Sequence, residues 1–124
     1  MLAGGSLTAG TPPFGRLSGV IPPSLGHSTD LAWLDLSSNS LASTIPASMG
    51  SLTALQSLLL LSDNDLVGTV PQSLANLTNL QFLSLANNRL SGGFPSWASS
   101  SSLSTLCVSG RTCSLFLCFH IFCP

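Results

Sequence analysis

The sequence predicts a solenoid, in which short parallel strands of successive repeats stack on one side and irregular, extended or 3-10 segments return on the other. A pattern Leu-x-(Gly/Ser)-x-(Ile/Val/Phe)-Pro starts at residues 17, 41, 66 and 90, so its copies are 24, 25 and 24 residues apart. The pattern Leu-x-x-Leu-x-Leu precedes three of the four copies, and an asparagine follows it each time. Self-similarity at a fixed period of this length is typical of repeat architectures.

The leucine pattern predicts the strands. Alternate residues of a strand face the same way, so Leu-x-Leu gives a short strand with one apolar side. Because one strand cannot bury that side alone, successive turns stack and share a core. We expect strands near 33–37, 57–61, 82–86 and 105–108. The leucines expected to point inward are Leu31, Leu34 and Leu36; Leu55, Leu58 and Leu60; and Leu80, Leu83 and Leu85. The middle repeat has one extra residue within 59–65, which leaves its register open.

The asparagine after each strand is expected to be structural. Asn39, Asn64 and Asn88 stand where the chain bends inward, and an amide side chain can pair with backbone groups that would otherwise be buried without partners. Asn87, next to Asn88, is expected to point into solvent. After the bend, the Gly of Leu-x-Gly permits a backbone conformation that other residues resist, and the Pro fixes an extended segment.

Three regions follow from these patterns. Residues 1–16 form an irregular Gly/Pro/Ser/Thr-rich segment, in which a decayed repeat could begin near Leu7; residues 17–112 form the repeat domain; and residues 113–124 form an apolar, cysteine-containing tail. All four cysteines lie within the last 18 residues, and their spacing does not fit the paired cysteines of structural zinc sites. Disulfides with three possible connectivities are one interpretation. The preferred interpretation is that the tail does not belong to the repeat protein.

The composition excludes several classes of function. Only three arginines and four aspartates carry charge, so the chain could not neutralise a row of nucleic-acid phosphates. No stretch approaches the roughly 20 apolar residues of a membrane helix, and the N-terminus has neither the basic start nor the apolar run of a signal peptide. The two histidines, His27 and His120, do not form a recognisable catalytic arrangement with the abundant serines. We therefore expect neither an enzyme nor a metal or cofactor site, and we expect a piece of a longer protein.

The repeats resemble the plant-type extracellular leucine-rich repeat proteins, whose consensus is LxxLxLxxNxLxGxIPxxLxxLxx, over residues 17–112. The run from Phe94 to Trp97 is similar to an internal FPxW repeat of receptor-like proteins. The resemblance implies a leucine-rich-repeat solenoid with an extracellular or cell-surface location. It also implies a binding module for a peptide, glycan or protein, as in receptor-like ectodomains, with a possible co-receptor. A secreted inhibitor or defence protein of the polygalacturonase-inhibiting type, or a truncated non-functional product, is the alternative.

The outward strand positions are the candidate ligand face. The residues proposed for ligand binding are Trp33, Asp35, Ser57, Leu59, Phe82 and Ser84. Trp33 and Phe82 share one column two turns apart, about 10 Å if the turns are spaced as parallel strands are. Exposed aromatic side chains are enriched at binding hot spots, and lateral packing between neighbouring turns is the alternative explanation of them.

Asn76, Leu77 and Thr78 form an acceptor sequence for N-glycosylation on the return segment, away from the expected ligand face. The same three residues also fit the repeat pattern, which is the alternative explanation of them.

Overall fold

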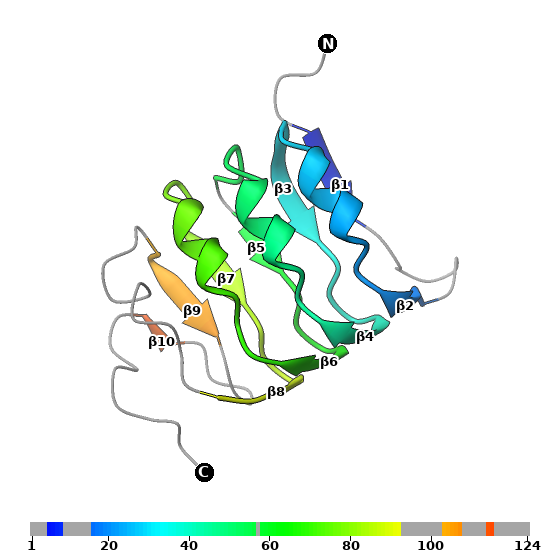
Figure 1. Ribbon diagram of the computed structural model, residues 1–124. Coiled ribbons are helices and arrows are strands. Elements are labelled where there is room, and N and C mark those ends of the chain that lie inside the picture. The colour runs from blue at the N-terminus through cyan, green and yellow to red at the C-terminus, as the bar shows by residue number, and fades with distance from the viewer. Residues whose placement is uncertain (1–4, 9–15, 57, 93–102, 108–113, 116–124) are drawn as a thin grey trace.

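The computed structural model of the chain describes residues 5–8, 16–56, 58–92, 103–107 and 114–115. Over these residues the chain winds into stacked turns, and each complete turn has a strand, a second extended segment and one short 3-10 helix (Figure 1). This arrangement confirms the predicted leucine-rich-repeat solenoid. No helix among these residues is long and apolar enough to cross a membrane.

The first sheet has six strands in the order β1-β3-β5-β7-β9-β10. Its strands are β1 (Gly5–Thr8), β3 (Leu31–Asp35), β5 (Leu58–Leu60), β7 (Phe82–Ser84), β9 (Thr105–Cys107) and β10 (Ser114–Leu115). All neighbouring pairs are parallel except β9 and β10, which run antiparallel. β1 lies in the segment that was expected to be irregular. Its Leu7 is paired with Leu34, three residues further along than a 24-residue spacing would place it.

A second parallel sheet, which the sequence analysis did not anticipate, runs along the adjoining side of the stack. It contains β2 (Ser18–Val20), β4 (Ser40–Thr44), β6 (Asp65–Gly68) and β8 (Arg89–Leu90), in that order. The third side carries the 3-10 helices η1 (Pro23–His27), η2 (Ala47–Ser51) and η3 (Gln72–Asn76), each of which follows a proline. The helices lie in front of the first sheet in Figure 1, and the second sheet closes the lower edge.

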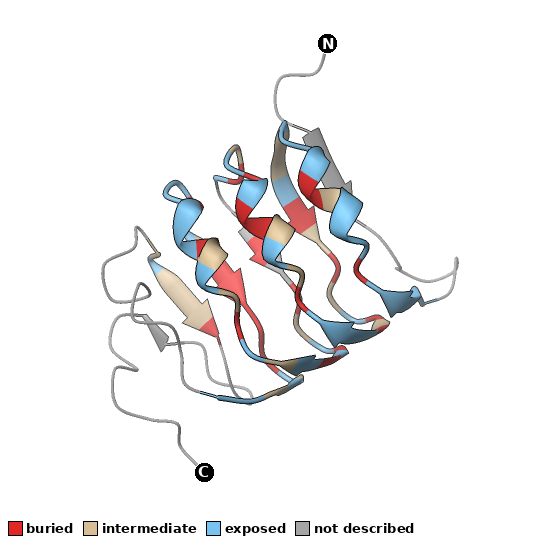
Figure 2. Cartoon of the chain, in the orientation of Figure 1, coloured by how far each residue is buried: buried red, intermediate tan, exposed pale blue. Residues whose placement is uncertain are grey.

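The core lies between these three sides and is built almost entirely from aliphatic side chains. In Figure 2, buried residues recur in the first-sheet strands and the 3-10 helices of successive turns, with exposed residues between them. The core residues are Ile21, Leu34, Leu36, Leu41, Ile45, Met49, Leu52, Leu55, Leu59, Leu61, Leu66, Val70, Leu74, Leu77, Leu80, Leu83 and Leu85. Since each turn contributes residues from all three sides, burial of the core requires neighbouring turns.

The register of the middle repeat differs from the expected one. Leu59 and Leu61 are fully buried, and Leu59 is aligned with Leu34 of β3 and Leu83 of β7. The expectation that Leu59 faces outward was therefore wrong, and the register expected for this repeat is displaced by one residue. Gln56 still follows the hydrogen-bond pattern of the neighbouring turns, whereas Leu58 is paired with Trp33 and Phe82. The register therefore shifts between Gln56 and Leu58, and the expectation that it shifts within 59–65 was wrong.

The physical reason for this register lies after the strand. Four consecutive leucines, 58–61, make two registers equally apolar, so hydrophobicity cannot choose between them. The hydrogen bonds of Asn64 determine the register, because its Nδ2 donates to the carbonyl oxygen of Leu61, three residues earlier. Asn39 and Asn88 make the same bond to Leu36 and Leu85.

The three asparagines link successive turns. The Oδ1 atoms of Asn39, Asn64 and Asn88 accept the backbone N–H groups of Leu17, Leu41 and Leu66 in the preceding turns, at 2.8, 3.0 and 3.0 Å. The Nδ2 of Asn64 also donates to the carbonyl oxygen of Leu36 in the preceding turn, and that of Asn88 donates to Leu61. Each side chain thus satisfies backbone groups that face the core, where water cannot replace them.

Candidate ligand-binding face

The outward side of the first sheet carries two columns of side-chain positions, which we call the strand face. In the backbone register, one column contains Ser6, Trp33, Leu58, Phe82 and Thr105, and the other contains Thr8, Asp35, Leu60, Ser84 and Cys107. The register thus places Trp33 and Phe82 in one column, two turns apart, with Leu58 between them. Leu59, which was expected on this face, belongs to the core because of the register described above. Ser57 lies outside the described residues.

Trp33 is the most accessible aromatic side chain among the described residues. It retains 46% of its surface on β3, whereas Phe82 on β7 is half-buried. Tryptophan is enriched at protein interfaces and at their hot spots, so an exposed Trp on a sheet face is a candidate contact for another molecule.

Asp35 lies two residues after Trp33 and therefore on the same side of β3. Its Oδ1 atom accepts two hydrogen bonds from Ser37, one from the backbone N–H at 3.0 Å and one from Oγ at 2.6 Å. These bonds fix the orientation of a half-buried carboxylate. The strand face therefore combines a large aromatic surface with a preoriented negative charge.

Accessibility of the second column falls toward the C-terminal end of the sheet. Asp35 is half-buried, but Ser84 retains only 7% of its surface and Cys107 none. The expectation that Ser84 is exposed was therefore wrong: its pairing with Cys107 puts it in the part of the column that solvent does not reach. Cys107 is disulfide-bonded, and the other cysteines of the chain lie outside the described residues. The accessible part of the strand face is thus the part near β3.

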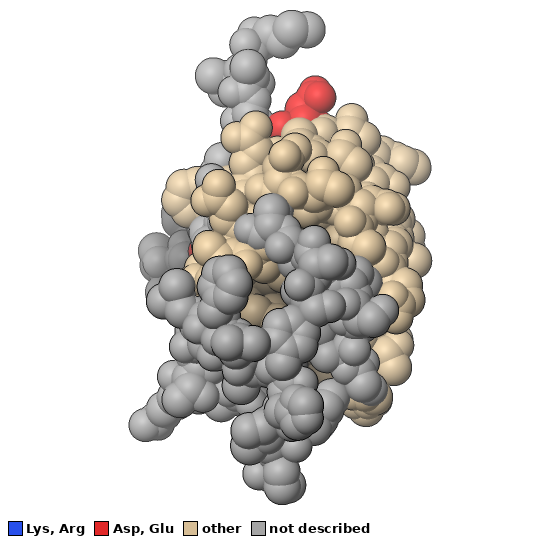
Figure 3. Space-filling model, turned by 90° about the vertical axis from the view of Figure 1, so that its left-hand side faces the viewer, with Lys and Arg blue, Asp and Glu red and all other residues tan. Residues whose placement is uncertain are grey.

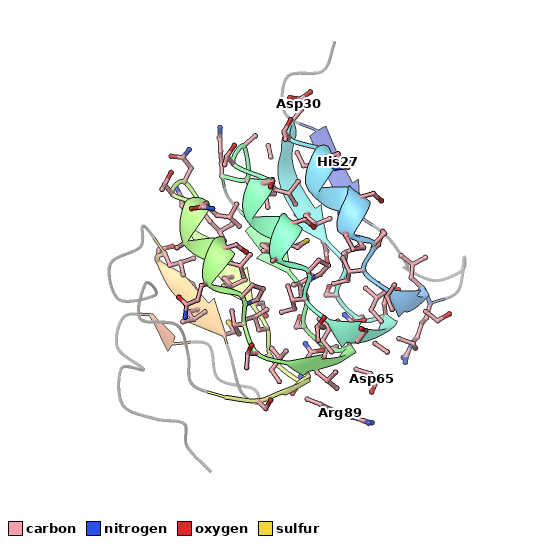
Figure 4. The ribbon with its side chains drawn as sticks, viewed as in Figure 1. His27, Asp30, Asp65 and Arg89 are labelled. Carbon is pink, nitrogen blue, oxygen red and sulfur yellow. The ribbon has the colours of Figure 1, made fainter. Side chains whose placement is uncertain are left out.

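Charged groups are sparse on the described surface. Seen from the β9 end, that surface is almost entirely uncharged, with acidic atoms near the top of the view (Figure 3). Asp65 and Arg89 form an exposed ion pair of 3.2 Å on the second sheet, and His27 and Asp30 lie near the start of β3 (Figure 4). Among the described residues there is no group of three His, Cys, Asp or Glu side chains that could hold a metal ion.

The acceptor sequence for N-glycosylation lies on the helix side of the stack. Asn76 is the last residue of η3, and both Asn76 and Thr78 are exposed. The strand face is on the other side of the core, as the positions of η3 and β7 in Figure 1 show.

Comparison with known proteins places the chain in a family. The model of the Leucine Rich Repeat family matches residues 30–52, 54–77 and 79–101, which is more than half of the 124 residues. The chain therefore belongs to the leucine-rich repeat family. Comparison with curated protein sequences gives no significant match.

Its neighbours among solved structures are plant receptor ectodomains. The crystal structure of PEPR1–AtPEP1 is 43% identical with a TM-score of 0.77, over 83% of this chain and 14% of that chain. The LRR ectodomain of the receptor kinase SOBIR1 from Arabidopsis thaliana is 34% identical with a TM-score of 0.75, over 86% of this chain and 55% of that chain. The Arabidopsis receptor kinase HAESA LRR ectodomain, in complex with an N-terminally extended IDA peptide hormone ligand, is 40% identical with a TM-score of 0.72, over 77% and 16%. The chain thus spans about a seventh to a half of the lengths of these structures.

Proposed function

We propose that the chain is a non-catalytic binding module that recognises an extended peptide or a protein segment on its strand face, near β3. The observation that carries this proposal is Trp33, which stays 46% exposed on the strand that buries Leu34, in the same column as Phe82. Buried aromatic anchors supply much of the affinity at protein interfaces. Two similar structures, of HAESA and RGFR1, hold peptide ligands, which supports a peptide or protein partner.

The proposal includes an extracellular or cell-surface location and a part in signalling, with the repeat region 17–112 as the binding unit. The neighbours that are described as ectodomains of plant receptor kinases support this location. A co-receptor is a further expected partner, because the BIR3–SERK2 complex contains a chain that is 38% identical to this one. The same setting would allow a glycan at Asn76.

A displayed library of random dodecapeptides provides a test that requires no known ligand. Peptides are selected on the wild-type protein, and their affinities for Trp33→Ser and Val67→Ser are then measured. Val67→Ser is the control, because Val67 is an apolar residue of the second sheet that is 40% exposed. Loss of an aromatic anchor costs about 2 kcal/mol or more, so we expect roughly thirtyfold or greater weakening of binding to Trp33→Ser. The Val67→Ser variant should bind as the wild type does.

Equal affinities of the two variants, whether retained or lost, would contradict recognition by the strand face. The selection could also yield no peptide, while an oligosaccharide binds the wild type and Val67→Ser but not Trp33→Ser. That result would mean that the ligand is a glycan and not a peptide.

The glycan at Asn76 is tested by expression through a secretory pathway. An endoglycosidase should shift the mass of the wild-type protein by one N-glycan and should leave Asn76→Gln unchanged. Asn79→Gln is the matched control, since Asn79 is exposed nearby but Gln81 replaces the hydroxyl residue that an acceptor sequence needs. A mass shift that persists in Asn76→Gln would exclude this site.

A further inference from the structure

Trp33 and Asp35 present two complementary groups on one side of β3. Their Cα atoms are roughly 6–7 Å apart, as for any residues two apart on a strand, and both side chains stand on the strand face. Among aromatic side chains, an indole attracts a guanidinium or ammonium group over its face most strongly, at up to about 6 Å from the ring centre. The carboxylate attracts the same cation from the side.

The Asp35 carboxylate is held ready for such a partner. Both hydrogen bonds from Ser37 go to Oδ1, and no hydrogen bond from a described residue reaches Oδ2. The half-burial of Asp35 reduces screening by water, so an ion pair here is stronger than one between fully exposed side chains. A guanidinium that binds Oδ2 would meet an acceptor whose orientation is already fixed.

No cation of the described residues fills this role. Arg89 pairs with Asp65 on the second sheet, and Arg16 precedes β2, so neither lies on the strand face. The other described aspartates are placed differently: Asp63 accepts a hydrogen bond from Asn87 at 2.7 Å, and Asp30 lies in the exposed turn before β3. Asp35 is thus a negative charge on the candidate face without a basic partner among the described residues.

We infer that the strand face recognises a basic side chain, arginine or lysine, of its peptide ligand, with the cation held between the indole of Trp33 and the carboxylate of Asp35. The inference rests on the proposed function and narrows its ligand to peptides that carry a positive charge. Acidic peptides are disfavoured by the same carboxylate, because burying like charges together costs free energy.

Peptides from the displayed library decide this inference. We expect arginine or lysine to be enriched at one position of the peptides selected on the wild type and on Asp30→Asn, a control that removes an aspartate outside the strand face. Binding to Asp35→Asn should be at least fivefold weaker. Asn keeps an oxygen for the hydrogen bonds from Ser37, so this variant tests the charge and not the fold.

Citrulline in place of the selected arginine gives an independent measurement on the unchanged protein. Citrulline keeps the shape and most hydrogen bonds of arginine but lacks its charge, so we expect a similar fivefold loss on the wild type. On Asp35→Asn the difference between the citrulline and arginine peptides should be smaller than on the wild type, because only the contact of the cation with the indole of Trp33 remains. This measurement also decides the matter if Asp35→Asn does not fold.

Two different failures are distinguishable. Peptides without basic enrichment, which lose affinity for Trp33→Ser but not for Asp35→Asn, would overturn the cation inference and leave recognition by the strand face intact. Peptides that bind Trp33→Ser as well as they bind the wild type would overturn both.

Discussion

At the scale of single residues, two adjacent asparagines have unlike roles. The Asn88 side chain accepts the backbone N–H of Leu66 and donates to three carbonyl groups, two of its own turn and one of the preceding turn. Asn87 is exposed, has a φ of 55° and donates to Asp63. Outward exposure of Asn87 agrees with the sequence-based expectation, but its backbone conformation could not be expected from the repeat pattern alone.

Asn88→Ala should destabilise the protein by about 1–3 kcal/mol, because it leaves backbone groups near the core without partners. The control at the neighbouring position is Asn87→Gly, since Ala at a positive φ would add strain of its own. We expect Asn87→Gly to change stability by less than about 1 kcal/mol. Chemical denaturation of both variants measures the difference. A larger loss in Asn87→Gly would contradict the hydrogen bonds described here.

Ser43 is a second residue whose backbone conformation does not suit its side chain. It has a φ of 72°, whereas the corresponding positions of the other turns, Gly19, Gly68 and Gly92, hold glycines with φ of 93°, 80° and 79°. Non-glycine residues in this region store strain of about 1 kcal/mol or more. Ser43 is exposed, so its side chain contributes little packing in return.

Ser43→Gly should therefore stabilise the protein, by up to about 1 kcal/mol after the entropy that glycine adds to the unfolded chain. Ser40→Gly in the same strand should destabilise it by about 0.5–1 kcal/mol, because Ser40 has no positive φ to relieve. Thermal melts of the two variants should thus shift in opposite directions. Melting temperatures that fall in both would show that Ser43 is not strained.

At the scale of elements, the sequence predicted the inward and outward positions of a strand best where the two sides carry different types of residue. Leu34 and Leu83 were assigned to the core correctly, since polar or aromatic neighbours mark the outward side. The leucine run 58–61 carries no such contrast, and the choice of register depends on the hydrogen bonds of Asn64. The second sheet was missed because its strands are short and mostly exposed, and β4 and β6 each have a single buried residue, so they show no alternation of buried and exposed positions.

The close packing of the 3-10 helices gives a test of how the turns stack. A Cβ atom at Gly50 of η2 would lie 2.7 Å from the Cβ of Ser73 in η3 and would also overlap the backbone oxygen of Ser73. Gly50→Ala should therefore push the two turns apart and destabilise the protein by about 2 kcal/mol or more, as overpacking of a core does. Ala47→Gly in η2 is the control, since Ala47 is exposed, and should cost less than about 1 kcal/mol. Denaturation curves that coincide for the two variants would disprove the close approach.

At the scale of the whole molecule, the accessible strand face is a property of the assembled stack. The positions of Trp33 and Asp35 could be predicted from the repeat, because strand alternation alone determines them. The burial of Ser84 could not be predicted, since it arises at the C-terminal end of the sheet, where the repeat pattern stops and β9 meets an antiparallel strand. The candidate site is therefore narrower than the strand pattern indicated, and it lies toward β3.

The stacking of the turns also predicts which strands are destabilised by a single substitution. Each element of the described chain contacts only the elements of neighbouring turns, so stability should be a sum of local terms and not a single all-or-none quantity. Cys107 ends β9, is fully buried and is disulfide-bonded, so Cys107→Ala removes a crosslink, a change that typically costs about 2–4 kcal/mol. Amide hydrogen exchange of Cys107→Ala should show lost protection in β9 and β7 while β3 and β4 stay protected.

Leu34→Ala, which opens a cavity in β3, should produce the reverse pattern. Equal loss of protection in every strand, for either variant, would mean that the turns unfold as one cooperative unit.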